Sequence, residues 1–584
     1  MRRSTLILLV AAVFICVTSL GTAFAGEKKA EKAYRLKVGA GYYTTSTDRD
    51  KTNTNVAEYD DTGGSPTGLF GYTGSFGKNF IDMNARYTTQ DDNAGDVNLD
   101  INRVFRFKMD YNKFIHRTRH DPLFQEELHG QNVVNPIFSS EGVKEGAQVW
   151  KYTDQQPGND YQIYRQLTRM NAKVTVPSFP ALTFHAGWRN EVRHGWKQGT
   201  VMTGKCTPCH IVGYGNRIDQ TTNDLSGGAT LKVGVVTVDY NYTHRKFDND
   251  ASTQSIHYDP VVTHNPARDA IFGNRLSLVN ADGIRNLIPD SKKDTHVVKA
   301  RADLPGETTA YGSFVCTTME DDYNDLDVDQ HVYNLRVTKD FMKRRLTLSG
   351  RFRYIDIHSD DAHVTVNDHF ASFDPAYNND MDFSFVRKSA IDRDQYTVSL
   401  DAAYRLNRCT TFRLGYEFED IDRDNLVVTG SNETETERHK VKLAVNGRPN
   451  SKWKYRVSYT YMHYNDPFGN ARGTCQRVEN LGVGTTPYFE VFNEENRMND
   501  RSVYPEDSHE IKLSATYMPK TTMSINGLFQ YTHQNNDHTN WDSDRYMAGI
   551  NFWFMPMKKL SFSLGYNYEY DRYGSYVCTD LFAG

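Results

Sequence analysis

The stretch RLTLSGRFRY at residues 345–354 of this 584-residue chain alternates strictly between two kinds of side chain. In an extended strand its two leucines, Phe352 and Tyr354 fall on one face, and its three arginines, Thr347 and Ser349 fall on the other. A strand with one apolar and one charged face suits a sheet that has lipid on one side and water on the other.

The same two-residue period recurs from Tyr34 almost to the carboxyl terminus, and no helical period of comparable length competes with it. Apolar or aromatic stripes of this kind occur at 34–42, 81–87, 105–111, 236–242, 346–354, 396–404, 453–461, 511–517, 546–554 and 560–570. A soluble propeller or solenoid would need a regular repeat, and a multidomain sandwich would need linkers. The sequence shows neither feature.

The connections between these stripes alternate in length. Short turns are expected at 77–79, 177–180, 304–306, 342–343, 406–408, 447–450, 518–520 and 555–558. Long polar loops are expected at about 116–160, 193–223, 247–292 and 463–506. Short periplasmic turns and long extracellular loops are typical of bacterial outer-membrane barrels. We therefore predict an all-β, antiparallel transmembrane barrel of about 22 strands, within a range of about 20 to 26.

The amino terminus has the organisation of a secretory signal peptide. Arg2 and Arg3 form a positive region, residues 6–17 are apolar, and Ala23-Phe24-Ala25 matches the small-residue cleavage pattern. We expect residues 1–25 to be removed on export, which leaves 26–584 as a single barrel domain in the bacterial outer membrane.

Composition excludes two other classes of protein. The 68 Lys and Arg residues against 73 Asp and Glu residues give a net charge of -5, without the basic excess of a nucleic-acid binder. A mean hydropathy of -0.66 is too low for a chain made of membrane-spanning helices. No Ser/His/Asp constellation stands out from the background, so we expect no enzyme.

One motif carries recognisable chemistry. Cys206, Cys209 and His210 form the sequence C-x-x-C-H, in which two thiols can bind the haem vinyl groups while the histidine reaches the iron. These three residues are the candidate site for one covalent haem c, with His210 as the proximal ligand of its iron. A short redox-active disulfide, a metal site shared with another ligand, and no function at all remain open.

A sixth ligand to that iron cannot be chosen from the sequence. The candidates in the flanking segments are His185, His194, Met202, His244, His257 and His264. The other cysteines of the exported chain are scattered. Cys316 and Cys409 lie within strand patterns, where a thiol acts as a small apolar side chain, whereas Cys475 lies in a long loop and Cys578 near the end.

Taken together, the signal peptide, the early alternation, about twenty strands and the C-x-x-C-H motif resemble the MtrB/PioB family of outer-membrane barrels. Similar Met-Pro hairpins occur at 517–520 and 554–560. Two features depart from the family pattern. Some members have a C-x-x-C near the mature amino terminus, which is absent before Cys206, and the terminal aromatic is displaced to Phe582.

The resemblance implies a barrel that sheathes a chain of haems for electron transfer across the outer membrane. Those haems would be carried mainly by a periplasmic multihaem c-type cytochrome inserted in the lumen, with an extracellular multihaem cytochrome as a further partner. The barrel itself would insulate and position the haems, surrounded by outer-membrane lipid and without contact to nucleic acid.

A passive diffusion porin without a redox role is the main alternative, because Arg345, Arg351 and Arg353 could select anions. Such a porin does not need the C-x-x-C-H motif. A TonB-dependent receptor would need a plug domain before the barrel, whereas the alternation here begins at Tyr34.

Overall fold

The structure is a computed structural model. It describes residues 32–44, 64–118, 120, 150–156, 158–159, 161–202, 209–260, 279–285, 287–366, 383–387, 389, 391–423, 435–465, 505–537, 541–558 and 560–574. Within these ranges every regular element is a β-strand, which confirms the all-β expectation. This part of the chain contains no helix long and apolar enough to cross a membrane.

The main sheet has 22 strands, in agreement with the predicted number. Its strands are β1 (Lys32–Tyr43), β2 (Ser65–Phe76), β3 (Asn79–Tyr87), β4 (Asn93–Ile101), β5 (Phe105–Arg117), β6 (Trp150–Asp154), β7 (Gln162–Thr175), β8 (Leu182–Met202), β9 (Cys209–Val233), β10 (Val236–Asn249), β13 (Ser291–Leu304), β14 (Thr308–Asp321), β15 (Leu326–Phe341), β16 (Leu346–Ser359), β19 (Arg393–Arg405), β20 (Thr410–Asp422), β21 (Glu435–Gly447), β22 (Trp453–Asn465), β23 (Asp507–Lys520), β24 (Met523–Asn536), β25 (Trp541–Met557) and β26 (Leu560–Gly574).

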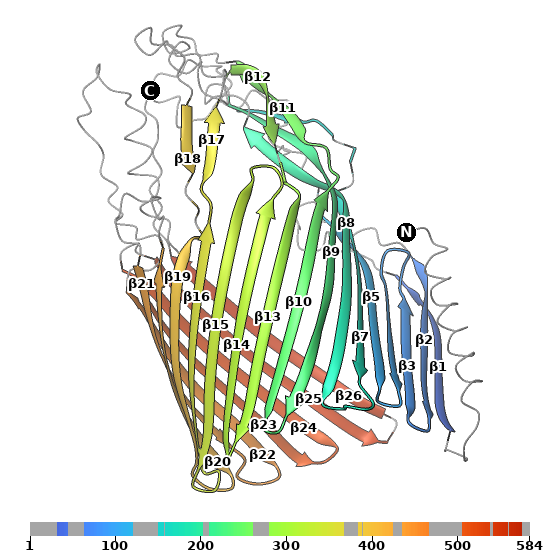
Figure 1. Cartoon of the computed structure of the whole chain (residues 1–584), viewed down its shortest axis with the longest axis vertical. Coiled ribbons are helices and arrows are strands. Elements are labelled where there is room, and N and C mark those ends of the chain that lie inside the picture. The colour runs from blue at the N-terminus through green and yellow to red at the C-terminus, as the bar shows by residue number, and fades with distance from the viewer. Residues whose placement is uncertain are drawn as a thin grey trace.

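Most of these strands pair antiparallel with the next one along the chain and form one curved wall (Figure 1). Three pairings skip short elements, namely β5 with β7, β10 with β13, and β16 with β19. Only β6 pairs in parallel, on the edge of β9. The wall ends at β1 and β26, and no pairing between these two occurs among the described residues.

Two small sheets lie beyond the wall, at the end that carries the long loops (Figure 1). They are formed by β11 (Gln254–Pro260) with β12 (Val279–Arg285), and by β17 (Ala362–Val366) with β18 (Phe383–Arg387). The expected loops at 116–160 and 247–292 therefore contain short strands. Of the expected loop at 463–506, residues 466–504 lie outside the described part.

The wall exposes its large apolar side chains instead of burying them. Leu400 is 59% exposed and Leu414 is 52% exposed, whereas Ser399 and Ser458, on the opposite face, are buried. Exposed apolar surface of this extent marks contact with a membrane or a partner. The alternation seen in the sequence therefore has its apolar face outward, as a barrel in lipid requires.

The turns at the short end agree with the sequence, with two corrections. The turns expected at 518–520 and 555–558 lie slightly further along, because β23 continues to Lys520 and β25 to Met557. The register shifts between Tyr517 and Lys520 and between Phe554 and Met557. Proline has no N–H to give to the ladder, so each Met-Pro is accommodated at a bulge instead of ending the strand.

The prediction of a long loop at 193–223 was wrong, because most of this segment forms a β-hairpin. The pairing of β8 with β9 runs without interruption from Leu182 opposite Leu231 to Met202 opposite Ile211. A strand that extends beyond the membrane has no face in contact with lipid. Its sequence therefore lacks the alternation of apolar and polar residues that identifies strands in the wall.

Cys409 also differs from its prediction. It is exposed and lies in the short turn before β20, where its N–H donates to Oδ1 of Asn407 at 2.8 Å. The asparagine side chain stabilises the turn, and β20 begins at Thr410, one residue after Cys409. Cys316 lies within β14, as predicted, and both thiols are free.

Candidate functional site

The last two residues of the C-x-x-C-H motif lie at the end of the β8–β9 hairpin. Cys206 lies outside the described residues, whereas Cys209 and His210 are the first two residues of β9. Their backbone pairs in parallel with Trp150 and Lys151 of β6. The structure therefore places Cys209 and His210 at the beginning of β9, in a mixed sheet of three strands.

The hairpin projects well beyond its neighbours in the wall (Figure 1). Pairing of β7 with β8 stops at Gly195, and pairing of β10 with β9 stops at Gln220. The remaining part of β8, as far as Met202, pairs only with β9 and spans roughly 24 Å at about 3.4 Å per residue. Cys209 and His210 are thus held outside the apolar band, at the long-loop end.

Gly195 marks the point at which β8 leaves β7. Its φ of 141° lies in a region that side chains rarely adopt, and a Cβ here would lie 2.1 Å from the carbonyl oxygen of Gln162. Only glycine is tolerated in such a position. The glycine therefore fixes how the hairpin departs from the wall.

Contacts on both sides hold the projecting part of β9. Val201, Val212 and Tyr214 form a buried cluster with Ile256 of β11. The N–H of Gln155 donates to the carbonyl oxygen of Gly213 at 2.8 Å. Nε2 of Gln254 donates to the carbonyl oxygen of Gly215 at 2.7 Å. The hairpin is therefore braced by β6 and β11.

A buried polar cluster of His120, Asp154 and Tyr161 lies beside the projecting hairpin. The carboxylate of Asp154 contacts Nε2 of His120 and accepts from the N–H of Gln156 at 3.1 Å, while Nδ1 of His120 lies 2.9 Å from the carbonyl oxygen of Asn159. The His120 ring also packs edge-on against Tyr161, with centroids 4.8 Å apart. Burial raises the pKa of the Tyr161 hydroxyl, and the negative charge of Asp154 raises it further.

The structure separates the candidate sixth ligands into two groups. His185, His194 and His244 lie in the wall, where their rings contact Asp239, Tyr164 and Asp294, respectively. His194 precedes Met202 by about 27 Å along β8, so this group does not approach the motif.

The second group lies in the projecting hairpin and in β11, which packs against it. Met202 pairs with Ile211, and His257 lies in β11, where its Nδ1 contacts Asp282 at 3.0 Å. That contact leaves Nε2 of His257 for another partner, the arrangement usual for histidines that ligate metals. His264 lies outside the described residues.

The inner face of the wall is lined by ion pairs that link successive strands. Nε of Arg165 donates to Glu191 at 2.5 Å, and Arg189 contacts the same carboxylate. Arg189 also reaches Asp224 at 3.2 Å, and Nε of Arg245 donates to Asp224 at 2.7 Å. This ladder crosses β7, β8, β9 and β10.

A second network includes one of the arginines from the stretch at 345–354. Arg351 contacts Glu417 at 2.7 Å, and Arg438 contacts both Glu417 at 2.9 Å and Glu419 at 3.0 Å. Arg345 instead donates to the carbonyl oxygen of Leu406 at the short turn. Because Arg351 is paired, the wall at this point presents both signs of charge and not the cationic face that would select anions.

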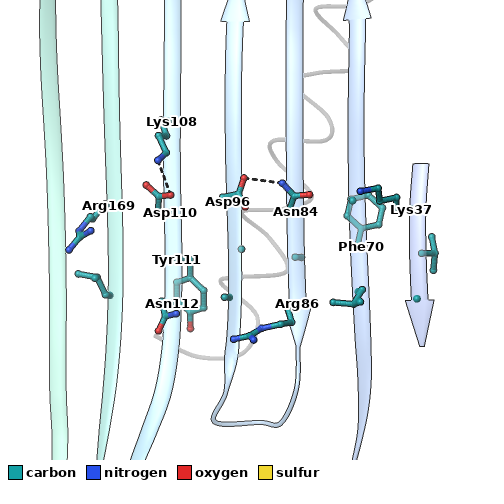
Figure 2. Close-up of a pocket in the computed structure, with 18 residues that line it drawn as sticks. Lys37, Phe70, Asn84, Arg86, Asp96, Lys108, Asp110, Tyr111, Asn112 and Arg169 are labelled. Carbon is teal, nitrogen blue, oxygen red and sulfur yellow. Dashed lines mark hydrogen bonds and ion pairs between the residues drawn. The ribbon is translucent and has the colours of Figure 1, made fainter. Parts of the chain in front are cut away.

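A hollow of about 770 Å³ indents the inner face near the amino terminus (Figure 2). Gly39 and Gly71 line this hollow and contribute no side chain to fill it. Charged residues from β1, β3, β4, β5 and β7 also line it. These are Lys37, Arg86, Asp96, Lys108, Asp110 and Arg169. Such a depression can receive a polar protein surface.

Comparison with known protein families confirms the resemblance to the MtrB/PioB family that the sequence suggested. The family model described as an outer membrane beta-barrel porin, MtrB/PioB, matches residues 48–575. The chain belongs to the MtrB/PioB family. Its membership, its all-β wall and its outward apolar face agree in assigning it to the outer-membrane barrels of bacteria.

This MtrB/PioB chain is similar in structure to several solved transporters and receptors. The copper transporter OprC has 9% identity and a TM-score of 0.49, with 92% of this chain and 74% of that chain covered. The ferric enterobactin receptor PfeA has 11% identity and a TM-score of 0.49, with 92% and 76% covered. The receptor Fiu from E. coli K12 has 9% identity and a TM-score of 0.44, with 91% and 75% covered. No curated protein matches the chain.

Sequence reasoning missed several groups in this MtrB/PioB barrel. Glu417, which pairs with Arg351, lies on a different strand far along the chain, and no spacing rule connects the two. His120 and Asp154 meet across a long loop for the same reason. The alternation of charged residues in the sequence predicts that a side chain lies on the inner face of the wall. It does not predict which residue of another strand pairs with it.

Proposed function

We propose that this MtrB/PioB barrel sheathes and positions a multihaem c-type cytochrome, so that electrons cross the outer membrane. We further propose that Cys206 and Cys209 bind one haem of the barrel's own, with His210 as its proximal ligand. A periplasmic cytochrome would occupy the lumen, and an extracellular multihaem cytochrome would meet the long-loop end. We assign no chemical reaction to the barrel itself.

The position of the motif carries the proposal. A diffusion porin has no use for a thiol pair followed by histidine at the tip of a hairpin that projects beyond the wall. A haem there would lie where electrons leave the lumen. The bracing of the hairpin by β6 and β11 supports the same role, because electron transfer needs a fixed distance between haems.

The donor set near the tip fits haem. Two thiols and one imidazole provide two thioether positions and one axial ligand. Met202 is the last residue of β8 and His257 lies in β11, which packs against the hairpin, and both residue types serve as axial haem ligands. Haem would supply one-electron redox chemistry, and the chain would hold it in place and set its exposure to water.

The inner wall supports a protein-filled lumen. Its ion pairs offer hydrogen-bond partners of both signs, as polar protein interfaces do. The hollow in Figure 2 adds a depression for a protruding side chain. A passive porin is the second candidate, favoured by the family's description as a porin.

Purification of the tagged full chain from native outer membranes tests both parts. We expect a multihaem cytochrome to copurify, and we expect the tryptic peptide with Cys206 to carry the mass of one haem. Replacing Cys206 and Cys209 with Ala should abolish haem staining of the barrel band but leave its copurification and heat-modifiable migration intact. A barrel that purifies alone and conducts freely in planar bilayers would favour the passive porin, and an unmodified peptide would reject the barrel's own haem.

A further inference from the structure

The outer face of the wall carries a five-residue unit in the middle of β10 and in the half of β13 that lies nearer the long loops. Tyr240, Tyr242 and His244 alternate along β10, and Asp294 and His296 face them from β13. The Tyr242 hydroxyl donates to Asp294 at 2.5 Å, and Nδ1 of His244 contacts the same oxygen at 2.9 Å. The Tyr240 hydroxyl bonds Nδ1 of His296 at 3.0 Å.

The same unit recurs on β22 and β23. Tyr459, Tyr461 and His463 alternate along β22, and Asp507 and His509 face them. The Tyr461 hydroxyl donates to Asp507 at 2.8 Å, and Nδ1 of His463 contacts the same oxygen at 3.0 Å. The Tyr459 hydroxyl bonds Nδ1 of His509 at 2.8 Å. The central tyrosine and histidine rings lie 4.9 Å apart in both units.

The two copies are not neighbours. They are separated along the wall by β14, β15, β16, β19, β20 and β21. A partial third copy follows on β24 and β25, where Asp544 accepts from Tyr531 at 2.8 Å and contacts Nδ1 of His533 at 2.9 Å. Neither the ion pairs of the inner wall nor the C-x-x-C-H hairpin includes any of these residues.

Both units border the apolar band of the outer face. On β10 the positions that precede the unit on the same face are Val236 and Val238, and both are exposed. On the second pair of strands they are Val457 of β22 and Leu513 of β23, also exposed. Because the short turns mark the periplasmic side, the units lie on the outer-leaflet side of these apolar residues.

The chemistry of the units fits a headgroup with many hydroxyl groups. Each unit presents flat aromatic rings beside a carboxylate and two imidazoles, so it offers stacking faces, donors and acceptors together. The Asp294 carboxylate holds Nδ1 of His244, which leaves Nε2 for a phosphate or a hydroxyl. Nε2 of His463 already contacts Asn465 at 3.0 Å.

The second unit also lines a hollow of about 520 Å³ on the outer face. Its walls are Tyr459, Tyr461, Asp507, His509, His533 and Asn535. We propose that these Tyr/His/Asp units bind the phosphorylated sugar headgroup of an outer-leaflet glycolipid, such as lipid A. A simple phospholipid headgroup has a phosphate but lacks the sugar ring that the stacked aromatic side chains would cover. The proposal rests on the outer-membrane barrel and not on a cytochrome partner.

Native mass spectrometry of the full chain in nanodiscs tests this proposal. The nanodiscs contain phosphatidylethanolamine with a small fraction of either lipid A or phosphatidylglycerol as the probe. We expect the wild type to retain lipid A in preference to phosphatidylglycerol. Replacing both Asp294 and Asp507 with Asn should lower lipid A retention by about tenfold, because each change removes a hydrogen bond to a charged group.

Glu510→Gln is the matched control, since it removes a carboxylate from β23 on the inner face. This variant should retain lipid A as the wild type does. Tyr461→Phe keeps the ring and loses only the hydroxyl, so it reports on the site even if the double variant assembles poorly. Equal retention of the two probes by the wild type, or unchanged lipid A retention in both Tyr461→Phe and the double variant, would overturn the proposal.

Discussion

At the scale of single residues, Glu417 is the centre of the larger ion network on the inner wall. It contacts Arg351 at 2.7 Å and Arg438 at 2.9 Å, and Lys440 lies 3.7 Å away. Glu417→Gln would remove the carboxylate that Arg351 and Lys440 contact, whereas Arg438 would keep its contact with Glu419. We expect the free energy of unfolding to fall by about 1–3 kcal/mol, measured by urea titration in detergent micelles.

The same change should make the empty barrel more selective for anions, measured as a shift in reversal potential in planar bilayers. Glu569→Gln is the control, because Glu569 pairs with Arg545 at an exposed site, where loss of the pair should destabilise the fold less than loss of Glu417 does. Equal destabilisation by the two substitutions would contradict this account of the network.

At the scale of elements, Gly195 controls the projection of the β8–β9 hairpin. Gly195→Ala forces a Cβ against the carbonyl oxygen of Gln162, so the hairpin should leave the wall at a different angle or lose its pairing with β7. We expect the variant to insert normally but to be cut by external protease near the hairpin at least several times faster. Gly227→Ala, where a Cβ meets open space, should behave as the wild type. Equal protease resistance of the two variants would contradict the role of Gly195.

The elements also show what the sequence could predict. Strands such as β10 and β16 were predicted because lipid requires every second residue on a strand to be apolar. Val236, Val238 and Leu348 are exposed residues that meet this requirement. The upper part of β8 and β9 faces no lipid, so its residues carry no such period and it was predicted to be a loop. The C-x-x-C-H motif was found by spacing alone, but its place at the tip of a hairpin depends on pairing between distant residues.

At the scale of the whole molecule, the orientation of the barrel follows from its turns. Cys409 is exposed in a short turn, and short turns face the periplasm in barrels of this kind. In a variant whose other exported cysteines are replaced by Ala, we expect a membrane-impermeant maleimide to label Cys409 only after the outer membrane is permeabilised. The partly buried thiol of Cys316, retained alone in a second variant, should react much more slowly in both conditions. Labelling of Cys409 on intact cells would reverse the orientation.

Electron transfer across the membrane through a barrel filled by a cytochrome can be measured directly. The most direct measurement uses proteoliposomes that contain the complex purified from native membranes, loaded with reduced viologen attached to dextran and exposed to iron(III) oxide particles outside. Neither reagent can pass a pore, so only electron transfer through the protein can oxidise the dye. We predict rapid oxidation with the complex and none with the barrel stripped of cytochrome. A dye that stays reduced in the presence of the intact complex would contradict the account.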